Sequence, residues 1–351
     1  MGEMTRAAFL IPGDLGLPTG GYAYDRRVLA LLAAEGVDVA HVELPASYPS
    51  PTGADLAETE RIVAALPRDS VLLVDGLAYG AMPAELIRTF NRPIVALCHH
   101  PLALEAGLSP SRSAELKASE TATLTLARHV IVTSPATRAI LVQDFDVAAE
   151  HITVALPGTD PAPRAHGTGK PLQLLAVGSV VPRKGYDVLI CALAKLKDQD
   201  WHLNIAGADD RAPQTAMELR DLISETGLSA RVTLNGAVSD ERLAQLYACA
   251  DVFVMSSLFE GYGMVLAEAM ARGLPIVSTT GGAAAETVPD EAAIKVPPSD
   301  ATALATALRK IIGDAGLRTA MANASLRAGR ELPGWQDTAR TIASVIREVK
   351  T

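Results

Sequence analysis

SLFEGYGMVLAEAMARGLPIVS, residues 257–278, joins an acidic loop, a glycine turn, a helix and the start of a strand. The helix is predicted over 264–272, where Met, Leu, Ala, Glu and Arg are good helix formers. Gly273 is its expected C′ residue, and Pro275 prevents the helix from continuing. An apolar run at 250–256 comes before the stretch and predicts a buried strand. The sequence therefore indicates a strand, a turn, a helix and a second strand in succession.

The turn between that strand and that helix has the features of a ligand site. Gly261 and Gly263 let the chain bend where a side chain would clash. A helix that begins at Gly263 or Met264 presents unpaired N–H groups and a partial positive charge, which can bind an anion without basic side chains. Glu260 and Glu268 flank this point, and two carboxylates suit the hydroxyl pairs of a ribose and a sugar. The alternative is a surface loop and a Glu that favours the helix dipole, but the glycines favour a site.

The spacing of the two acids resembles a known family. Glu260, seven residues and Glu268, within FEGYGMVLAEAMARGLPIV, resemble the donor-site signature of retaining family-4 glycosyltransferases. The resemblance implies the GT-B fold, an α/β architecture of two Rossmann-like, doubly wound parallel-sheet domains facing across a cleft. It implies an acceptor-side domain at 1–165, a nucleotide-sugar-binding domain at 166–333, and a helix at 334–351 that returns towards the first domain.

Size and charge agree with a soluble two-domain protein. A chain of 351 residues forms about two domains, and 49% apolar with 20% charged residues is ordinary for a globular protein. Residues 1–165 carry 12 Lys and Arg against 19 Asp and Glu, so their net charge is −7. This acidity argues against nucleic acid as a partner and weakens the case for a polybasic lipid contact.

The cysteines and the apolar runs predict the cellular location. Cys98, Cys191 and Cys249 all lie in apolar contexts, which predicts buried, reduced thiols. No two of them have metal-ligand spacing, so no metal site is expected. No apolar run approaches the ~20 residues of a membrane span, and the N-terminus does not resemble a signal peptide. We expect a cytoplasmic protein without an integral membrane segment, with peripheral attachment to the inner membrane face left open.

The first strand and its loop predict a ligand-binding corner. A strand at 7–11, a Gly-rich loop and a helix from Tyr22 form the corner at which doubly wound sheets bind ligands. On its own this glycine pattern more often marks a tight turn. The family resemblance implies that Gly20 and Gly21 line the donor diphosphate from the N-terminal side.

Two histidines follow a later buried strand at 92–98. His99 and His100 lie at its carboxyl end, where open α/β sheets bind ligands, and Pro101 indicates a fixed turn. A lone histidine in such a place is more often structural. The resemblance implies a histidine near the transferred sugar, where it would hydrogen-bond the 6-hydroxyl or a similar group rather than act as a general base. The register favours His99, with His100 as the alternative.

Two cations follow the first strand of the second half, at 172–178. Arg183 and Lys184 precede a helix N-terminus, whose dipole disfavours them, so another interaction should hold them. The resemblance implies that they neutralise the donor diphosphate; the alternative is a solvated basic loop. Many family members have an Arg directly after the strand glycine, where this chain has Ser179. Either Arg183 covers both roles or the phosphate is held by one cation fewer.

Three further positions complete the expected donor site. Gly207 ends a predicted strand at the cleft. The resemblance implies that backbone groups around Ala237 and Val238 pair with the nucleobase edge, so no side chain identifies the base. A UDP-hexose is favoured, and GDP- and ADP-hexoses stay open. Asp209 and Asp210 are interpreted as a solvated loop rather than a metal site.

The expected activity is transfer of a hexose from a nucleotide sugar to an acceptor hydroxyl, with retention at the anomeric carbon. Arg183, Lys184 and the helix N-terminus, including Met264 and Val265, would stabilise the leaving diphosphate without a metal or cofactor. Glu260 would hold sugar hydroxyls and Glu268 the ribose. The acceptor could be a small alcohol, a glycan or a lipid-linked sugar.

Other classes of protein remain as alternatives. A GT-B nucleotide-sugar epimerase shares the architecture, but its acid and base carboxylates would lie elsewhere. A non-catalytic nucleotide-sugar-binding protein would keep the glycines and tolerate loss of the cations and the histidine. A dehydrogenase is disfavoured because no Gly-x-Gly-x-x-Gly follows the first strand.

Overall fold

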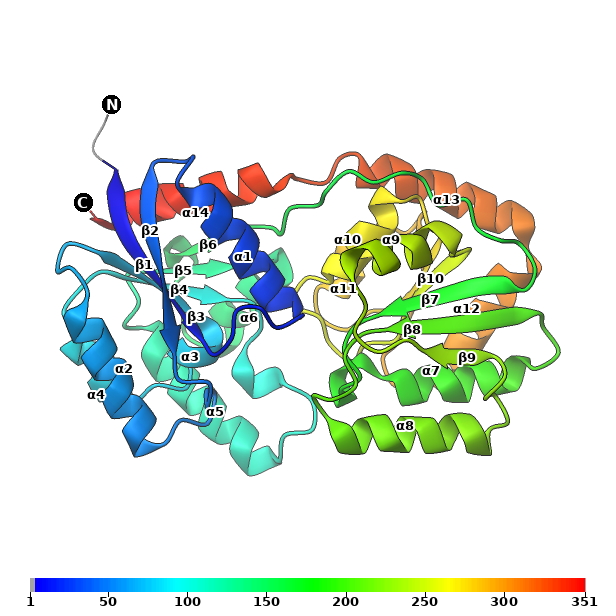
Figure 1. Cartoon of the computed structure of the whole chain (residues 1–351), viewed down its shortest axis with the longest axis horizontal. Coiled ribbons are helices and arrows are strands. Elements are labelled where there is room, and N and C mark those ends of the chain that lie inside the picture. The colour runs from blue at the N-terminus through cyan, green and yellow to red at the C-terminus, as the bar shows by residue number, and fades with distance from the viewer. Residues whose placement is uncertain (1–3, 351) are drawn as a thin grey trace. The chain divides into compact units, whose positions relative to one another are not determined.

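The computed structural model describes residues 4–350 and divides into two compact units (Figure 1). Unit 1 comprises the chain up to Gly158 together with the segment from Pro333 onward, and unit 2 runs from Thr159 to Leu332. Within the described residues, no helix combines the length and the apolar composition that a bilayer span requires.

Unit 1 is built on a six-stranded parallel sheet in the order β2-β1-β3-β4-β5-β6. Its strands are β1 (Thr5–Pro12), β2 (Val37–Leu44), β3 (Val71–Asp75), β4 (Ile94–Cys98), β5 (His129–Val132) and β6 (Ile152–Val154). Its α-helices are α1 (Gly20–Leu32), α2 (Gly53–Ala65), α3 (Gly76–Tyr79), α4 (Ala84–Thr89), α5 (Pro110–Leu124), α6 (Pro135–Asp144) and α14 (Trp335–Lys350).

Both faces of the middle of this sheet are covered, which is why β3 and β4 are buried along their whole length, whereas the edge strand β2 has exposed polar residues. Leu10, Leu72 and Val74 point into one core, which they share with apolar residues of α2, α4, α5 and α6. The opposite face is covered by α1 and α14. Helix α14 comes from the C-terminal end of the chain and lies along α1 and strands β1 to β5 (Figure 1).

Unit 2 contains a second six-stranded parallel sheet, in the order β12-β11-β10-β7-β8-β9. Its strands are β7 (Leu172–Val177), β8 (Trp201–Ala206), β9 (Val232–Leu234), β10 (Val252–Met255), β11 (Ile276–Thr279) and β12 (Ala293–Val296). Its α-helices are α7 (Tyr186–Leu193), α8 (Pro213–Glu225), α9 (Asp240–Cys249), α10 (Met264–Ala271), α11 (Ala284–Thr287), α12 (Ala301–Gly313) and α13 (Ala315–Gly329). Helices α7 and α8 lie on one side of the sheet, and α9 and α10 on the other (Figure 1).

The stretch 257–278 folds as its sequence predicts. Helix α10 begins at Met264, directly after Gly263, which has a φ of 89°. It ends before Gly273, which has a φ of 64°. Both values lie in the left-handed region that glycine adopts without strain. The two doubly wound parallel sheets expected from the sequence are confirmed.

Two local predictions differ from the structure: the start of one helix and the burial of the cysteines. After the Pro- and Ser-containing segment 101–113, the sequence predicts a helix from about Ala114 to Arg128. Helix α5 instead begins at Pro110, because Ser109 caps its N-terminus and proline suits the first helical position. The prediction that all three cysteines are buried is wrong for two of them. Cys98 is buried at the end of β4, whereas Cys191 is exposed and Cys249 is only partly buried.

Candidate active site

The residues predicted to act on the donor are divided between the two units. Unit 1 holds Gly20, Gly21 and His99. Unit 2 holds all the others, namely Arg183, Lys184, Gly207, Val238, Glu260, Gly261, Gly263, Met264, Val265 and Glu268. Each set forms its own constellation at the carboxyl end of its sheet, where parallel α/β sheets bind ligands.

Glu260 is the centre of the constellation in unit 2. Its Oε1 accepts hydrogen bonds from Lys184 Nζ at 2.7 Å and from Ser257 Oγ at 2.6 Å. Its Oε2 lies 3.2 Å from Arg183 Nη1, which also donates to the Phe259 carbonyl. The carboxylate is buried, at 7% exposure, and so it needs these partners. This cluster, Glu260 with Arg183, Lys184 and Ser257, is called the glutamate cluster below.

The charges in the glutamate cluster outweigh the cost of its burial. Burial by itself would raise the pKa of Glu260, but the Lys184 and Arg183 charges and the hydrogen bonds hold that pKa at about 2. The carboxylate is therefore ionised throughout the physiological range. Its ion pairs also hold Arg183 and Lys184 just before the N-terminus of a helix, where the helix dipole disfavours cations.

Backbone contacts fix the loop that carries Glu260. Glu260 N donates to the Gly281 carbonyl at 3.2 Å, and Ala283 N donates to the Glu260 carbonyl at 2.9 Å. A Cβ at Gly281 or Gly282 would collide with the backbone of residues 258–260. The glycine pair after β11 is thus needed for close packing, and its link to the site was not predicted from the sequence.

Glu268 lies on α10, about one turn after Met264 and Val265. It is partly buried, and its Oε2 accepts a hydrogen bond from the Tyr247 hydroxyl at 2.9 Å. Burial raises the pKa of Glu268, against the lowering effects of that hydrogen bond and of the Arg272 charge. Arg272 lies 4.3 Å above the Tyr247 ring. The first N–H groups of α10 have no acceptor within the helix and are available to a ligand.

Gly207 and Val238 lie in loops that follow strands of the same sheet. Gly207 follows β8 and packs so tightly against Gly178 that a Cβ there would collide with the Gly178 carbonyl. Val238 is partly buried between β9 and α9. Both positions therefore lie at the carboxyl end of the sheet, as does the turn at Gly261 and Gly263.

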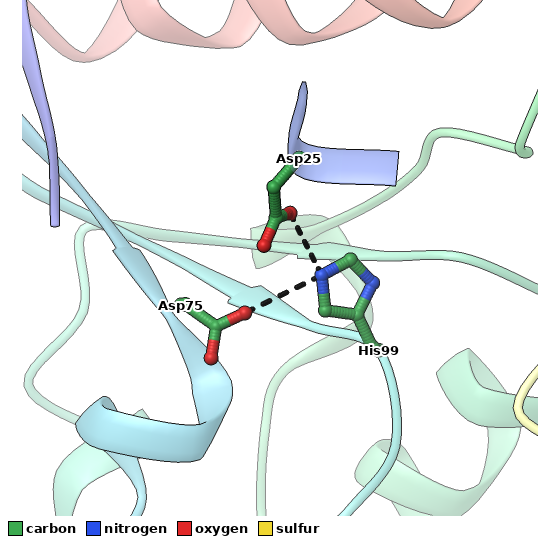
Figure 2. Close-up of side chains that lie close together, drawn as sticks. All are labelled: Asp25, Asp75 and His99. Atoms are coloured by element: carbon green, nitrogen blue, oxygen red, sulfur yellow. Dashed lines mark hydrogen bonds and ion pairs between the residues drawn. The ribbon is translucent and has the colours of Figure 1, made fainter. Parts of the chain in front are cut away.

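His99 is the centre of the constellation in unit 1 (Figure 2). Its Nε2 lies 2.9 Å from Asp25 Oδ1 and 3.4 Å from Asp75 Oδ2. Asp25 comes from the second turn of α1, and Asp75 is the last residue of β3. Both aspartates are buried, at 0% and 2% exposure. Gly21 packs beside the ring, since a Cβ there would lie 3.4 Å from His99 Cδ2. Asp25, Asp75 and His99 are called the histidine cluster below.

The contacts in this cluster shift the pKa values of His99 and Asp25. Burial by itself would lower the pKa of His99, but Asp25 and Asp75 raise it to about 10. Burial raises the pKa of Asp25 to about 7, although the His99 charge lowers it. His100 points to a different partner, Glu105, with 3.6 Å between His100 Nε2 and Glu105 Oε2. His99 and not His100 thus belongs to the histidine cluster.

Within the described residues, the histidine cluster is also the group of side chains whose geometry could hold a metal ion. Its three ligand atoms lie within 4.8 Å of one another. In the glutamate cluster, a carboxylate is instead neutralised by two cations, which disfavours a metal ion there. The absence of a metal from the reaction stays a prediction.

Four residues near these clusters were missed by the sequence analysis: Asp25, Asp75, Tyr247 and Ser257. Asp25 had a usable signal, because it occupies the buried stripe of α1 that continues at Val28 and Leu32. A charge on such a stripe needs a partner. Asp75 also had one, because it ends a strand as the His99 segment does. Tyr247 and Ser257 gave no signal that separates them from ordinary core and loop residues.

Comparisons with known proteins identify the family of this chain. A family model for glycosyl transferases group 1 matches residues 160–327, and one for glycosyltransferase family 4 matches residues 53–163. D-inositol 3-phosphate glycosyltransferase of an Arthrobacter species is 32% identical over 81% of this chain and 72% of its own. Mannosylfructose-phosphate synthase of Agrobacterium fabrum is 32% identical over 44% of this chain, and the match spans only 38% of that protein.

Solved structures show the same fold over nearly the whole chain. Sucrose-phosphate synthase from Thermosynechococcus elongatus superposes with a TM-score of 0.84 at 24% identity, covering 98% of each chain. HepE from Anabaena, solved in complex with UDP-glucose, gives a TM-score of 0.77 at 19% identity, covering 98% of this chain and 99% of its own. Two family models that match successive parts of the chain, and a relative aligned with 81% of it, show that this protein is a family-4 glycosyltransferase with the GT-B fold.

Proposed function

We propose that this glycosyltransferase transfers a hexose from a nucleotide sugar to an acceptor hydroxyl, with retention at the anomeric carbon and without a metal ion. The observation that carries the proposal is the glutamate cluster. Two cations converge on one ionised carboxylate, in the same unit as the free N–H groups at the start of α10. This arrangement supplies positive charge for a diphosphate and an acceptor for sugar hydroxyls.

The cations act on the charge that develops as the donor breaks. The bond from the anomeric carbon to the diphosphate oxygen breaks, and its electron pair leaves with the nucleoside diphosphate. Arg183, Lys184 and the N–H groups at Gly263, Met264 and Val265 stabilise that charge, which lowers the barrier to departure. A new bond forms from the acceptor oxygen to the same face of the sugar. The acceptor proton passes to the leaving phosphate oxygen, so no separate base is required.

The remaining predicted residues bind the donor. Glu268 holds the ribose diol, and its hydrogen bond from Tyr247 keeps the carboxylate in one orientation. Glu260 and His99 hold hydroxyls of the transferred sugar. Gly20, Gly21, Gly207 and Gly261 allow the backbone to approach the donor, and backbone groups at Val238 contact the base.

The donor is proposed to be a UDP-hexose, and the acceptor a small phosphorylated polyol or sugar. The fold neighbour HepE is solved with UDP-glucose, which makes that compound the first donor to test. Two relatives carry a phosphorylated compound in their names, an inositol phosphate and a mannosylfructose phosphate. We propose the same class of acceptor here, in a cytoplasmic enzyme.

The first experiment is a thermal shift and donor-hydrolysis panel of UDP-, GDP- and ADP-hexoses, with and without EDTA. We expect one donor to stabilise and to turn over, with no effect of the chelator. Addition of inositol 3-phosphate or a hexose phosphate should then give a product whose anomeric configuration, read by NMR coupling, matches that of the donor. Inversion, or a requirement for a divalent cation, would contradict the mechanism. Epimerisation of the donor sugar without transfer would favour a nucleotide-sugar epimerase instead.

A matched pair of variants tests the ribose contact. Glu268→Gln should weaken nucleotide binding by roughly 10- to 150-fold, the equivalent of about 1.5–3 kcal/mol for one charged hydrogen bond. Glu286→Gln removes an exposed carboxylate of the same unit and should leave affinity unchanged. Equal affinity of the two variants in calorimetry would rule out the role given to Glu268.

A further inference from the structure

The histidine cluster contains more acid than the proposed function uses. Two aspartates, Asp25 and Asp75, are buried side by side against one imidazole, and sugar binding by His99 requires neither of them directly. Among residues 4–350, His99 is the basic side chain that forms an ion pair with either aspartate. Carboxylates removed from water need a counter-charge or a proton: burial raises the pKa of Asp25 to about 7, and the imidazole is the group placed to supply the counter-charge.

The geometry decides which ring nitrogen is left for a ligand. Nε2 faces both carboxylates, at 2.9 Å from Asp25 Oδ1 and 3.4 Å from Asp75 Oδ2, and must therefore carry a proton. Figure 2 shows Nδ1 on the opposite side of the ring, pointing away from both aspartates. The His99 side chain is 20% exposed although its acidic partners are fully enclosed, so part of the ring is open to a ligand.

The surroundings hold the imidazole in this one orientation. Tyr24 packs edge-to-face against it, with 5.0 Å between ring centroids, and the Tyr24 hydroxyl is itself fixed by a hydrogen bond to the Ala155 carbonyl. The Gly21 backbone packs beside the Cδ2 edge. The Asp75 carboxylate is fixed as well, because Oδ1 accepts a hydrogen bond from Leu77 N at 2.8 Å. The titratable groups that face the ring are thus Asp25 and Tyr24 of α1 and Asp75 at the end of β3.

We propose that Asp25 and Asp75 are positioning residues that keep His99 doubly protonated, so that Nδ1–H is presented as a hydrogen-bond donor to a hydroxyl of the transferred sugar. The proposal rests on the proposed function, in which His99 contacts that sugar. It adds that His99 acts only as a donor, because neither ring nitrogen is left to accept a proton. The raised pKa of His99, about 10, agrees with this geometry.

The protonation state can be measured without any enzymatic reaction. The full chain, labelled with ¹⁵N-histidine, is titrated by NMR from about pH 6 to about pH 8.5, a range in which an ordinary histidine loses its proton. We expect both His99 nitrogens to keep imidazolium shifts throughout. The signal is assigned with a His99→Gln variant. A His99 that titrates near the ordinary value would overturn the proposal, whether or not the protein transfers a sugar.

Variants then test whether the aspartates are the cause. Asp25→Asn is nearly isosteric and should make His99 titrate within that pH range, and Asp75→Asn should act in the same direction. Asp38→Asn removes an exposed aspartate of unit 1 and should change nothing. An unchanged His99 titration in both cluster variants would overturn the proposal. If one variant fails to fold, the titration of His99 in the other variant and in the wild-type protein still tests the proposal.

Kinetics separate positioning from a merely structural role. With the donor identified above, we expect Asp25→Asn to lower kcat about tenfold while the Kd for UDP stays unchanged, because UDP lacks the sugar that His99 contacts. A 6-deoxy donor lacks the contacted hydroxyl. It should slow transfer by the wild-type protein more than it slows transfer by the His99→Gln variant. Equal loss of UDP affinity and of kcat in Asp25→Asn would indicate a general structural effect and contradict the proposal.

One competing reading of the same geometry is a bound metal. His99, Asp25 and Asp75 could each provide one ligand atom. Elemental analysis of the purified full chain distinguishes a bound metal ion from a protonated imidazole. Zinc or another transition metal present at one per chain, and lost in Asp25→Asn, would show that Nε2 carries a metal rather than a proton, and would overturn the proposal. If donor turnover fails across the whole panel, the proposed function fails, and the NMR and metal results still decide the state of His99.

Discussion

In unit 2 one carboxylate, Glu260, is shared by two cations, whereas in unit 1 one imidazole, His99, is shared by two carboxylates. The glutamate cluster therefore has a surplus of positive charge and suits a diphosphate. The histidine cluster sets two carboxyl groups against one imidazole and so has no surplus of positive charge. It suits a neutral hydroxyl, which needs a fixed hydrogen-bond donor. The carboxyl groups of both clusters are buried, and in each cluster the shared group has its pKa displaced in the direction that keeps it charged.

The two clusters should also differ in whether their ion pairs stabilise the fold or orient a side chain. When a carboxylate that is shared by two cations is neutralised, both cations lose their counter-charge. A cation with two carboxylates keeps one partner when either aspartate is neutralised. The glutamate cluster should therefore respond to mutation mainly in stability, and the aspartates of the histidine cluster mainly in the protonation of His99.

The largest effect is expected from Glu260→Gln. It leaves the partly buried side chains of Arg183 and Lys184 without a counter-charge, which should cost unit 2 about 3 kcal/mol, the lower end of the range for a broken buried ion pair. The two tryptophans report the units separately, since Trp201 lies in unit 2 and Trp335 in unit 1. Denaturant unfolding in a Trp335→Phe background therefore follows unit 2 through Trp201. Glu286→Gln, the exposed control, should stay within about 0.5 kcal/mol. Equal stability of the two variants would contradict the central role of Glu260.

Acid should remove the same stabilisation. The pKa of Glu260 is about 2 in the folded protein, below its ordinary value, so ionised Glu260 favours the folded state at neutral pH. This stabilisation is fully present above about pH 4.5 and is lost as the pH falls through about 2. Its size is about 3 kcal/mol. The difference in unfolding free energy between the unchanged protein and Glu260→Gln should shrink over that acid range, and a constant difference would sink the prediction.

A smaller effect is expected from His99→Gln, which keeps an N–H donor but removes the charge. We expect unit 1 to lose about 2 kcal/mol near pH 6, the value of a charged hydrogen bond. The pKa of His99 is raised to about 10, so this stabilisation is fully present below about pH 6.5 and is lost as the pH rises through about 10. His41→Gln changes an exposed histidine and serves as the control, with Trp335 fluorescence as the readout. A loss that grows with pH would reverse the sign and refute the account.

The smallest effect concerns Glu268, the carboxylate whose direct hydrogen-bond donor is a neutral hydroxyl. Tyr247→Phe removes that donor at 2.9 Å and should cost about 1 kcal/mol of stability. Nucleotide affinity should fall about fivefold, because Glu268 is no longer held in one orientation. Tyr262→Phe, at a buried tyrosine close to the same helix, should leave the affinity unchanged. Calorimetric titration with UDP compares the two, and identical affinities would remove Tyr247 from the donor site.

The sequence by itself determined the features that depend on neighbouring residues. The helix at Met264–Ala271 begins and ends where its glycines demand, and the apolar runs predict two parallel sheets, because capping, turn formation and hydrophobic periodicity act over a few residues. The predicted donor-site residues Arg183, Lys184 and Glu260 could be named because the family motifs that imply them are short and continuous in the sequence.

Only the tertiary structure decided which of these residues meet. Asp25 and His99 are 74 positions apart, and they touch because α1 begins at the end of the sheet where β4 ends. Asp75 joins them because β3 lies between β1 and β4. Likewise, Lys184 and Glu260 are 76 positions apart, and the ion pair between them helps to hold the two cations. The packing of α14 onto α1 is of the same kind. No local pattern encodes such contacts, because they follow from strand order and from the burial of charges that need a partner.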